Sequence, residues 1–427
     1  MQVFIKSFGC SANQADSEVL AGCLIQAGYK LSVSEADADV LIFNTCAVKG
    51  PTENSVIDVL RHVPKEKKVI VAGCLPKISF DRLQREVRFD GAIGPAVGRE
   101  IVNVVSRVWA GEKVIELDCL SDLPKLDLPR VKSNPVVSVV PISSGCLGSC
   151  AYCCVVHARG HLRSYIAKEI LSRVQSDVAG GVKEFWFTGQ DTACYGIDLC
   201  SNLAELLSSI SKLPGDFKVR VGMMTPNVVT PMQDSLIEAF KSEKVFKFLH
   251  LPIQSGADET LKRMRRFYTV SDFKSIVDAF RIQFPELTLA TDVIIGFPGE
   301  TEEAFESTLK LLEEVNPDVV NVSKFFARPK TEAAKMQERI VEKEIKRRSA
   351  VASVVAKRVS FEQNKRWEGW VGDILVDERG KFEGSWVGRN FAYKPIVVKS
   401  NTDLLGRTLK VRIVEATSTY LKGNLFE

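Results

Sequence analysis

Three cysteines stand close together in the middle of the chain, in the segment SSGCLGSCAYCCV. Cys146, Cys150 and Cys153 have the spacing Cys-x3-Cys-x2-Cys, and an apolar run that predicts a strand (136–142) ends just before them. Thiolates at this spacing on a turn can wrap one iron–sulfur cube and bind three of its irons. The fourth iron then keeps an open coordination position, which distinguishes a catalytic metal site from a structural one. The segment therefore predicts a loop that holds a catalytic cluster.

A structural zinc site is the alternative for these cysteines. Zinc would need a fourth ligand nearby, which Cys154 or His157 could supply. The position of the loop favours the cluster, because it stands where the first strand-to-helix loop of a barrel is expected, with Tyr152 immediately before the third cysteine. Cys154 directly follows Cys153 and leaves the identity of the third ligand open.

Strand and helix patterns alternate over residues 1–118. Apolar runs at 3–8, 39–45 and 67–73 predict strands, and apolar residues at helical spacing over 17–28 predict a helix that ends at Gly28. Strands that are apolar on both faces are typical of parallel sheets covered by helices. We expect an open α/β domain of flavodoxin-like type in this part of the chain.

Two further units are expected after a linker. The segment 119–135, rich in Pro, Asp and Ser, predicts the linker. Helical stretches then separate six candidate strands within 136–360, which predicts a full or partial barrel with its site at the carboxyl ends of the strands. These strands are 136–142, 184–189, 217–222, 246–252, 288–296 and 318–325. A long basic helix from about Glu342 leads into residues 364–427, where short alternating strands broken by glycine predict a small antiparallel barrel.

Three other cysteines each follow one of the expected N-terminal strands. Cys10, Cys46 and Cys74 come directly after the apolar runs or within two residues of them. The carboxyl ends of parallel strands meet at one edge of an open sheet, so these side chains can converge although they are far apart in the sequence. We expect a second triad of cluster ligands there; the alternative is three independently buried cysteines. Cys23, on the apolar face of a predicted helix, and Cys194 and Cys200, near predicted loops, are expected to be small core residues.

Net charge and hydropathy set only broad limits. A net charge of +4 is too small by itself to predict a polyanionic partner. The 11 cysteines do not follow the pattern of a small secreted disulfide scaffold, so metal binding or catalysis is the better interpretation. No apolar run is long enough to cross a bilayer and the first residues lack the order of a signal peptide, so we expect a cytoplasmic protein without a membrane partner.

The cysteine array resembles that of the radical S-adenosylmethionine (radical SAM) superfamily, and other segments narrow the resemblance. FTGQD (187–191) looks like the segment of that superfamily that receives the methionyl amine. HLPIQSGAD with LKRMRRFYT (250–269), and TDVIIGFPGET (291–301), are similar in order and spacing to methylthiotransferase motifs. The N-terminal pattern FGCSANQADSE, NTC and GCLP also resembles the first domain of the methylthiotransferases, so the resemblance covers almost the whole chain.

This resemblance implies a fold and a cofactor set. The fold would be a flavodoxin-like open-sheet domain, a partial TIM-like radical SAM barrel and a small all-β TRAM barrel. Two 4Fe-4S clusters and S-adenosylmethionine (SAM) are expected, one cluster on Cys146, Cys150 and Cys153 and the other on the N-terminal triad. The residues implied to line the SAM pocket, where packing and strand-end capping are the alternatives, are Tyr152, Gly189, Gln190, Asp191, Arg220, Gln254, Ser255 and Asp292.

The implied reaction is sulfur insertion at an unactivated C–H bond, followed by methyl transfer. Acid–base catalysis cannot perform it, because that hydrogen is not appreciably acidic, so a cofactor must generate a radical. By resemblance, the loop cluster would cleave SAM to a 5′-deoxyadenosyl radical, the second cluster would carry the exogenous sulfur, and a second SAM would supply the methyl group. An electron donor and a sulfur donor are implied partners. A non-catalytic RNA-binding iron–sulfur protein is the rival class, but the FTGQD and QSG segments argue against it.

The C-terminal unit resembles a TRAM domain, which is associated with RNA binding. Its aromatic and basic residues are expected to contact phosphates and stack on bases, although about half of the aromatics could instead fill a barrel core. They are Trp367, Trp370, Trp386, Phe391 and Tyr393 with Arg366, Arg389, Lys394 and Lys399. Phosphate contact is also expected on the helix around Lys346, Arg347 and Arg348, where a solvated face is the alternative.

The family has three substrate branches: isopentenylated adenosine in tRNA, threonylcarbamoylated adenosine in tRNA, and an aspartate of a ribosomal protein. HARGHLRSY (157–165) resembles the threonylcarbamoyladenosine branch of archaea and eukaryotes, so we expect the protein to act on the anticodon stem-loop of tRNA, at C2 of this base. We also expect it to be a monomer. Arg159 and Arg163 are the candidates to meet the substrate carboxylate, unless they pair with cofactor or phosphate. Lys330 departs from the family pattern, which usually has glycine there.

Overall fold

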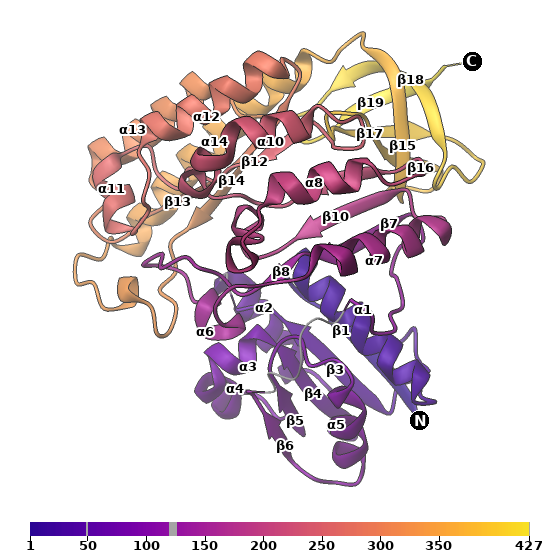
Figure 1. Cartoon of the computed structure of the whole chain (residues 1–427). Helices are drawn as coiled ribbons and strands as arrows, with labels where there is room; N and C mark the ends of the chain where they lie inside the picture. Colours follow the sequence, from indigo (N-terminus) through magenta and orange to yellow (C-terminus); the bar gives the residue numbers. More distant parts are fainter. Residues whose placement is uncertain (48–49, 119–125, 427) are drawn as a thin grey trace.

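The computed structural model describes residues 1–47, 50–118 and 126–426 (Figure 1). Three units follow one another along the chain: an α/β unit at the bottom of Figure 1, a half-open barrel above it, and a small β-barrel at the upper right. This architecture confirms the fold expected from the sequence. The residue limits given above for the units stay predictions, and one long helix runs through the limit expected at 360–364.

The N-terminal unit is a six-stranded parallel sheet with the strand order β2-β1-β3-β4-β5-β6. Every residue of the central strand β3 is buried, as expected for a run that is apolar on both faces. Helices cover both faces and form two separate apolar clusters with the sheet. The strands are β1 (Gln2–Ser7), β2 (Lys30–Leu31), β3 (Val40–Thr45), β4 (Lys68–Gly73), β5 (Gly91–Ile93) and β6 (Val114–Glu116). The helices are α1 (Ser11–Gln26), α2 (Gly50–Arg61), α3 (Cys74–Ile78), α4 (Phe80–Glu86) and α5 (Glu100–Trp109).

Helix α1 begins at Ser11, earlier than the predicted start at residue 17. Its first turns bury the polar residues Asn13 and Glu18. Both are bonded to other segments: Asn13 donates to the carbonyl of Thr45, and Glu18 accepts from the backbone of Ser133. A helix that buries polar side chains through such bonds lacks the apolar periodicity on which the prediction relied.

The middle unit is a partial barrel of six parallel strands. They form two ladders, β11-β10-β7 and β12-β13-β14, and a single bridge between Val219 and Val245 leads from the first ladder toward the second. The strands are β7 (Val137–Pro141), β10 (Glu184–Thr188), β11 (Lys218–Val221), β12 (Phe248–His250), β13 (Thr288–Ile295) and β14 (Val319–Lys324). All six lie within the runs predicted from the sequence.

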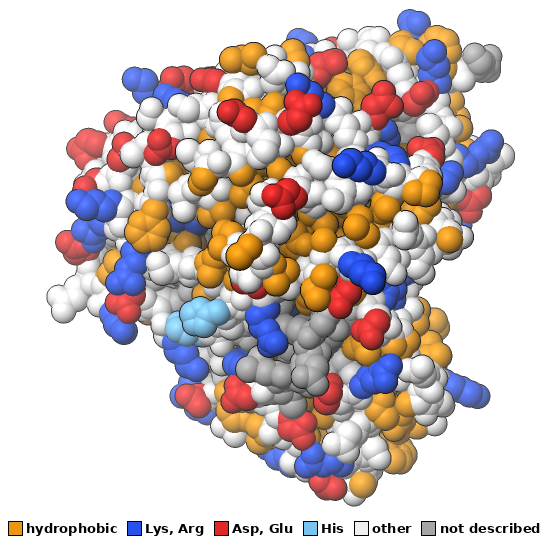
Figure 2. Space-filling model, viewed as in Figure 1, with side chains coloured by type: hydrophobic (Ala, Val, Ile, Leu, Met, Phe, Trp, Pro, Cys, Tyr) orange, Lys and Arg blue, Asp and Glu red, His pale blue; other side chains and the backbone are white. Residues whose placement is uncertain are grey.

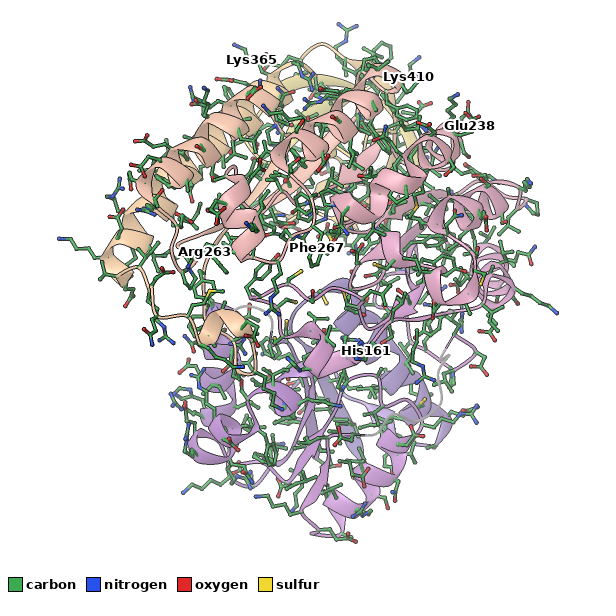
Figure 3. All side chains as sticks on the ribbon, turned by 60° about the vertical axis from the view of Figure 1, so that its left-hand side comes forward. His161, Glu238, Arg263, Phe267, Lys365 and Lys410 are labelled. Carbon is green, nitrogen blue, oxygen red and sulfur yellow. The ribbon has the colours of Figure 1, made fainter. Side chains whose placement is uncertain are left out.

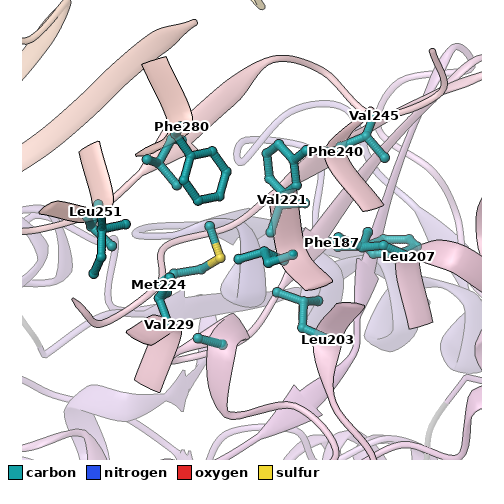
Figure 4. Close-up of a cluster of buried hydrophobic side chains, with 14 of the residues drawn as sticks. Phe187, Leu203, Leu207, Val221, Met224, Val229, Phe240, Val245, Leu251 and Phe280 are labelled. Atoms are coloured by element: carbon teal, nitrogen blue, oxygen red, sulfur yellow. The ribbon is translucent and has the colours of Figure 1, made fainter. Parts of the chain in front are cut away.

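Helices pack on the outer face of this partial barrel and bury one large apolar core. Figure 4 shows part of it, where Phe187, Val221, Met224, Phe240 and Phe280 meet. The helices are α7 (Ala167–Ala179), α8 (Leu203–Ser211), α9 (Pro226–Val229), α10 (Gln233–Phe240), α11 (Asp258–Arg263), α12 (Val270–Gln283), α13 (Glu302–Val315) and α14 (Glu342–Lys365). Short 3-10 turns are η1 (Thr192–Cys194), η2 (Ile197–Leu199), η3 (Thr230–Met232) and η4 (Glu332–Ala334). Strands β8 (Ser143–Ser144) and β9 (Arg163–Ser164) pair antiparallel. Helix α6 (Val155–Arg159) lies in the connection between them along the chain.

The C-terminal unit is a closed five-stranded barrel with the order β15-β16-β17-β19-β18. It has an apolar core of its own. Its strands are β15 (Val371–Arg379), β16 (Ser385–Arg389), β17 (Pro395–Lys399), β18 (Thr408–Ala416) and β19 (Leu421–Leu425).

The segment expected as a linker packs tightly where it is described. Residues 119–125 of it lie outside the described part of the chain. Leu126 is buried in the core of the partial barrel, and the buried Arg130 pairs with Asp177. The backbone of Val131 donates to the Glu18 carbonyl at 2.9 Å. Residues 126–135 therefore fix the first two units to each other, because they make buried contacts with both.

The outer surface carries both signs of charge. On the face drawn in Figure 2, acidic and basic side chains are mixed mostly toward the edges, while hydrophobic side chains gather across the middle. Among the described residues, no helix combines the length and apolar character needed to cross a membrane.

Candidate active site between two cysteine triads

Cys146, Cys150 and Cys153, called the loop triad here, lie on the loop between β8 and α6. The backbone N–H of Gly148 donates to Cys146 Sγ at 3.2 Å. A Cβ atom added at Gly148 would lie 3.2 Å from Cys146 Sγ and 3.6 Å from Cys150 Sγ, so both sulfurs face the same bare glycine. Burial raises the pKa of the Cys146 thiol to about 11 and that of Cys153 further. Such thiols stay protonated at neutral pH until a metal displaces the proton.

Arg266, in the segment that follows α11, contacts the loop triad. Its Nη1 donates to Cys150 Sγ at 3.1 Å, and its Nε donates to the Tyr268 hydroxyl at 3.0 Å. The backbone of Ala151 also donates to the Met264 carbonyl at 2.9 Å. Arg266 lies within the motif LKRMRRFYT, but nothing in the sequence distinguishes it from the other arginines of that segment. Only the tertiary contact with Cys150 distinguishes it.

The loop triad fits an iron–sulfur cluster. It offers three thiols, N–H donors to two of the sulfurs and a buried guanidinium, and Arg266 Nη2 has no hydrogen-bond partner. Within the described ranges, no three His, Cys, Asp or Glu side chains are grouped so as to hold a single metal ion. The ligands of a cube bind different irons and need not converge on one point.

Cys154 is turned away from the loop triad. Its thiol donates to the Ala47 carbonyl at 3.6 Å, and its side chain belongs to an apolar cluster of the N-terminal unit. His157 is exposed. This geometry favours Cys153 over Cys154 as the third ligand, and it leaves a zinc site without the neighbour that the alternative required.

Cys10, Cys46 and Cys74, called the strand-end triad here, follow the adjacent strands β1, β3 and β4. Gly9 has φ +121°, and a Cβ atom there would lie 2.6 Å from the Cys46 Cβ, so glycine lets the backbone of the Cys10 loop approach Cys46. A small cavity is lined by all three cysteines together with Asn13, Ala47, Cys154, Val155, Ala158, Arg159 and Gln190.

Arg159 lies beside the strand-end triad. Its side chain is only 6% exposed, pairs with Asp16 at 2.7 Å and donates to Asn13 Oδ1 at 3.3 Å. Burial raises the pKa of the Cys74 thiol to about 11, and the positive charge of Arg159 opposes this shift. A cation beside three thiols also fits a thiolate-bound cluster. Arg163, the other residue predicted to meet the substrate, is exposed on β9.

One short helix joins the two triads. Cys153 and Cys154 stand directly before α6, and Arg159 is its last residue. The helix runs from the loop triad to the strand-end cavity, which Cys154, Val155, Ala158 and Arg159 help to line. The hydroxyls of Ser11 and Thr188 lie 2.9 Å apart and link the Cys10 segment to the end of β10.

The predicted SAM residues after β10 lie at this junction between units. Gln190 lines the strand-end cavity, and its Oε1 is buried without a hydrogen-bond partner. Asp191 Oδ1 accepts from the backbone N–H groups of Ala193 and Thr225, so this carboxylate also caps local structure. A Cβ atom at Gly189 would come within 2.8 Å of Ser143 Oγ.

The other predicted SAM residues come from separate elements. Gln254 pairs with β13 through its backbone at φ +70°, and Ser255 Oγ accepts from the Ala257 N–H at 3.3 Å. Tyr152 packs edge-on against Phe297. Asp292 Oδ2 lies 2.7 Å from Nε2 of His250, a residue that was not among the predicted site residues.

Arg220 takes part in the joint with the C-terminal barrel. Its guanidinium lies 5.1 Å from the Phe248 ring centroid and 5.3 Å from that of Tyr393. These contacts place it against the C-terminal unit, in surroundings that the motif reasoning did not foresee.

The RNA surface expected on the C-terminal barrel is wrong for several of its residues. Trp367 and Trp386 fill the barrel core, and Tyr393 packs against Phe246 and Phe248 of the middle unit. Lys394 is buried and bonded to Asp318 and Asn364, each at 2.7 Å. A five-stranded barrel needs large side chains to fill it, so aromatic content alone does not indicate an RNA surface.

The basic helix α14 is also largely occupied by ion pairs. Arg347 pairs with Glu302 and Glu344, and Arg348 is buried against Glu300. Lys330, where glycine was expected, keeps the turn with φ +64°. A non-glycine residue in this conformation costs some backbone energy but does not change the path of the chain.

Family models match three parts of the sequence. They are described as Uncharacterized protein family UPF0004 over residues 2–94, Radical SAM superfamily over residues 140–312 and TRAM domain over residues 365–426.

Similar curated proteins match the chain over its full length. A protein of Methanothermobacter thermautotrophicus, named "Probable threonylcarbamoyladenosine tRNA methylthiotransferase", is 42% identical, with 99% of each chain covered. A Pyrococcus horikoshii protein of the same name is 40% identical over 100% of this chain and 99% of its own. The Homo sapiens "Threonylcarbamoyladenosine tRNA methylthiotransferase" is 33% identical over 99% of this chain and 73% of its own.

Solved structures share the fold at low sequence identity. The radical SAM methyltransferase TsrM from Kitasatospora setae superposes with a TM-score of 0.57 at 13% identity, over 78% of this chain and 74% of that one. The radical SAM enzyme OxsB gives a TM-score of 0.51 at 10% identity, over 83% of this chain and 56% of that one.

Proposed function

The chain belongs to the family of threonylcarbamoyladenosine tRNA methylthiotransferases, and from this premise we propose that it adds a methylthio group at C2 of N6-threonylcarbamoyladenosine beside the anticodon. It is a radical SAM enzyme that uses a 4Fe-4S cluster and SAM, and its substrate is a tRNA. The identity of the modified base is the finer part of the proposal, and so are a cytoplasmic location, a monomeric state, and separate donors of electrons and sulfur.

The observation that carries the proposal is the α6 connection between the triads. The reaction needs hydrogen removal and sulfur delivery at one carbon, so the two functions have to be held near each other. Cys153 precedes α6, while Cys154 and Arg159 line the cavity of the strand-end triad. We therefore propose that Cys10, Cys46 and Cys74 hold a second 4Fe-4S cluster that carries the sulfur to be inserted.

The residues of the chain have distinct tasks in this scheme. When bound, the loop cluster and SAM supply the radical that removes the C2 hydrogen, and a second SAM supplies the methyl group. Arg266 stabilises the Cys150 thiolate through its N–H donor. Arg159 places a positive charge beside the strand-end thiolates, and Gln190, whose amide oxygen has no hydrogen-bond partner, lines the same cavity. The exposed Arg163 is the candidate to pair with the substrate carboxylate, since Arg159 is already paired with Asp16.

Mass spectrometry of nucleosides from treated tRNA tests the substrate. Purified enzyme is incubated with SAM, a reductant and sulfide, and with tRNA that carries either threonylcarbamoyladenosine or isopentenyladenosine. We expect the methylthio product from the first substrate only, and a lower yield with Arg163→Met. Product from isopentenyladenosine alone would transfer the protein to the other tRNA branch, and modification of a ribosomal protein instead would refute the RNA substrate.

Anaerobic reconstitution tests the second cluster. We expect roughly eight irons per chain in the wild type and roughly four when Cys46 and Cys74 are both replaced by alanine, because each cube contains four irons. Four irons in both proteins would contradict a cluster on the strand-end triad.

A further inference from the structure

Phe267 is a large apolar side chain that is left in water. It is 71% exposed, although it lies in the segment that grips the loop triad. Figure 3 labels it at the edge of the middle unit that faces the N-terminal unit. Isolated exposed apolar residues are common and need no explanation, so its meaning depends on its surroundings.

The backbone around Phe267 is fixed by its neighbours. Arg266 and Tyr268, on either side, are buried. Arg266 is bonded to Cys150, and the Tyr268 hydroxyl lies 3.0 Å from the carbonyl oxygens of Pro252 and Ile253. These contacts hold Arg266 and Tyr268 inward, while Phe267 between them stays exposed. The ring therefore stands one residue from a group that touches a cysteine of the loop triad.

Positive charge accompanies the ring. Arg265 is about half exposed and adopts φ +55°, and its contact with Glu332 is 3.9 Å long. The neighbouring Lys262 is exposed as well. An exposed aromatic with flanking cations is the usual combination for unpaired nucleotides, where the ring stacks on a base and the cations meet phosphates.

The chemistry of the substrate explains why such a ring belongs there. The C2 edge of the adenosine has to come close to the loop triad, and enzymes that act on a base commonly turn it out of the stack to bring the target atom into such a site. Unstacking exposes the faces of the adjacent bases, and that loss can be offset by stacking on an aromatic side chain.

We propose that Phe267 stacks on an unpaired base of the tRNA anticodon loop next to the modified adenosine, with Arg265 on the adjoining phosphate. This inference rests on the proposed function for the identity of the RNA. It adds a determinant of substrate recognition outside the C-terminal barrel, where Trp367, Trp386, Tyr393 and Lys394 of the expected RNA surface are buried.

Binding of an anticodon stem-loop oligonucleotide tests the inference. The probe carries threonylcarbamoyladenosine, with 2-aminopurine in turn on each side of it. Phe267→Ala is expected to weaken binding and raise KM roughly tenfold, within the 1–3 kcal/mol attributed to one stacked base. Phe267→Trp is expected to retain affinity and the quenching of 2-aminopurine, whereas Phe267→Leu loses both. Arg265→Gln should remove about one phosphate contact. The slope of log affinity against log salt concentration should therefore fall by about one.

Two controls separate stacking from other effects. Phe382 lies on the C-terminal barrel and is 81% exposed. Phe382→Ala is the matched control because it also removes an exposed ring, and it is expected to bind as the wild type does. Iron content per chain is measured for each variant. Unchanged affinity in Phe267→Ala, full function in Phe267→Leu, or a loss of iron that accounts for the weaker binding would each overturn the inference. If the wild type modifies an isopentenyladenosine stem-loop instead, the proposed function fails, but a Phe267→Ala defect on that RNA would still support stacking.

Discussion

The two triads bring three cysteines together by opposite routes. The loop triad lies on one short loop, and the local chain places the sulfurs of Cys146 and Cys150 against Gly148. The strand-end triad is assembled by the order β1-β3-β4 in the sheet, so its geometry depends on strand register. In both triads the first cysteine directly follows a glycine with positive φ, which is +121° at Gly9 and +79° at Gly145. The comparison teaches that a local site can form with its loop, whereas a dispersed site can form only after the sheet has folded.

The largest expected effect is the separation of functions by cysteine substitution. Cys150→Ala should abolish SAM cleavage and product formation, because it removes a ligand of the loop triad. Cys46→Ala should leave part of the cleavage intact while blocking sulfur insertion. Chromatographic assay of 5′-deoxyadenosine beside nucleoside mass spectrometry measures both. Full product yield from Cys46→Ala would show that the strand-end triad is not the sulfur site.

Arg266 gives the next largest effect and acts only on the loop triad. Arg266→Met removes the hydrogen bond to Cys150 Sγ, so SAM cleavage should fall roughly 10- to 100-fold, as for other groups that support metal ligands. Arg265→Met, at the exposed neighbouring position, is the control for the lost charge. This variant should retain SAM cleavage when the assay contains no tRNA. Equal cleavage rates in the two variants would mean that the contact with Cys150 has no role.

Arg159 is the matching test for the strand-end triad. Replacing Arg159 by Met removes the positive charge near Cys74, so the second cluster should release iron to a chelator roughly tenfold faster. Arg159→Lys keeps the charge and should restore part of the retention, while SAM cleavage persists in both. If the loop triad lost iron faster instead, the assignment of Arg159 to the strand-end triad would be wrong.

The smallest effect concerns the hydrogen bond between the units that carry the two triads. Thr188→Val removes the bond to Ser11 with little change in volume, and its cost should be about 1 kcal/mol in free energy of unfolding. Urea denaturation of the two proteins measures it. Ser11→Ala should give a similar value, and no further loss in the double variant would show that the two residues act through one bond.

The fold was largely predictable because its strands carry strong apolar patterns. All six residues of β3 are buried, for example, and the sequence shows a near-continuous apolar run there. Both triads were also predictable, the first from spacing and the second from cysteines at the ends of strands. The early start of α1 was missed because polar residues such as Asn13 are buried there by bonds to distant segments.

The supporting groups of the site were harder to predict than the cysteines. Arg266 is distinguished from Arg263 and Arg265 only by its bond to Cys150, which joins positions 116 residues apart. Arg159 follows the loop triad in sequence, which made it a candidate to meet the substrate carboxylate or to pair with cofactor or phosphate, and α6 carries it to the cavity of the strand-end triad. The RNA role of the C-terminal aromatics was overestimated, because sequence composition does not distinguish a barrel core from a barrel surface.

The contact between Lys394 and Asp318 affects how this architecture can be recombined. The pair is buried at 2.7 Å, and besides Lys394 the half-exposed Arg366 lies 3.6 Å from the same carboxylate. Truncating one partner of a buried ion pair costs up to about 3–5 kcal/mol. A barrel grafted from a protein without this lysine would therefore weaken the chimera at its junction. Domain exchange, in evolution or in the laboratory, keeps the stability of this junction when the carboxylate and the lysine are inherited together.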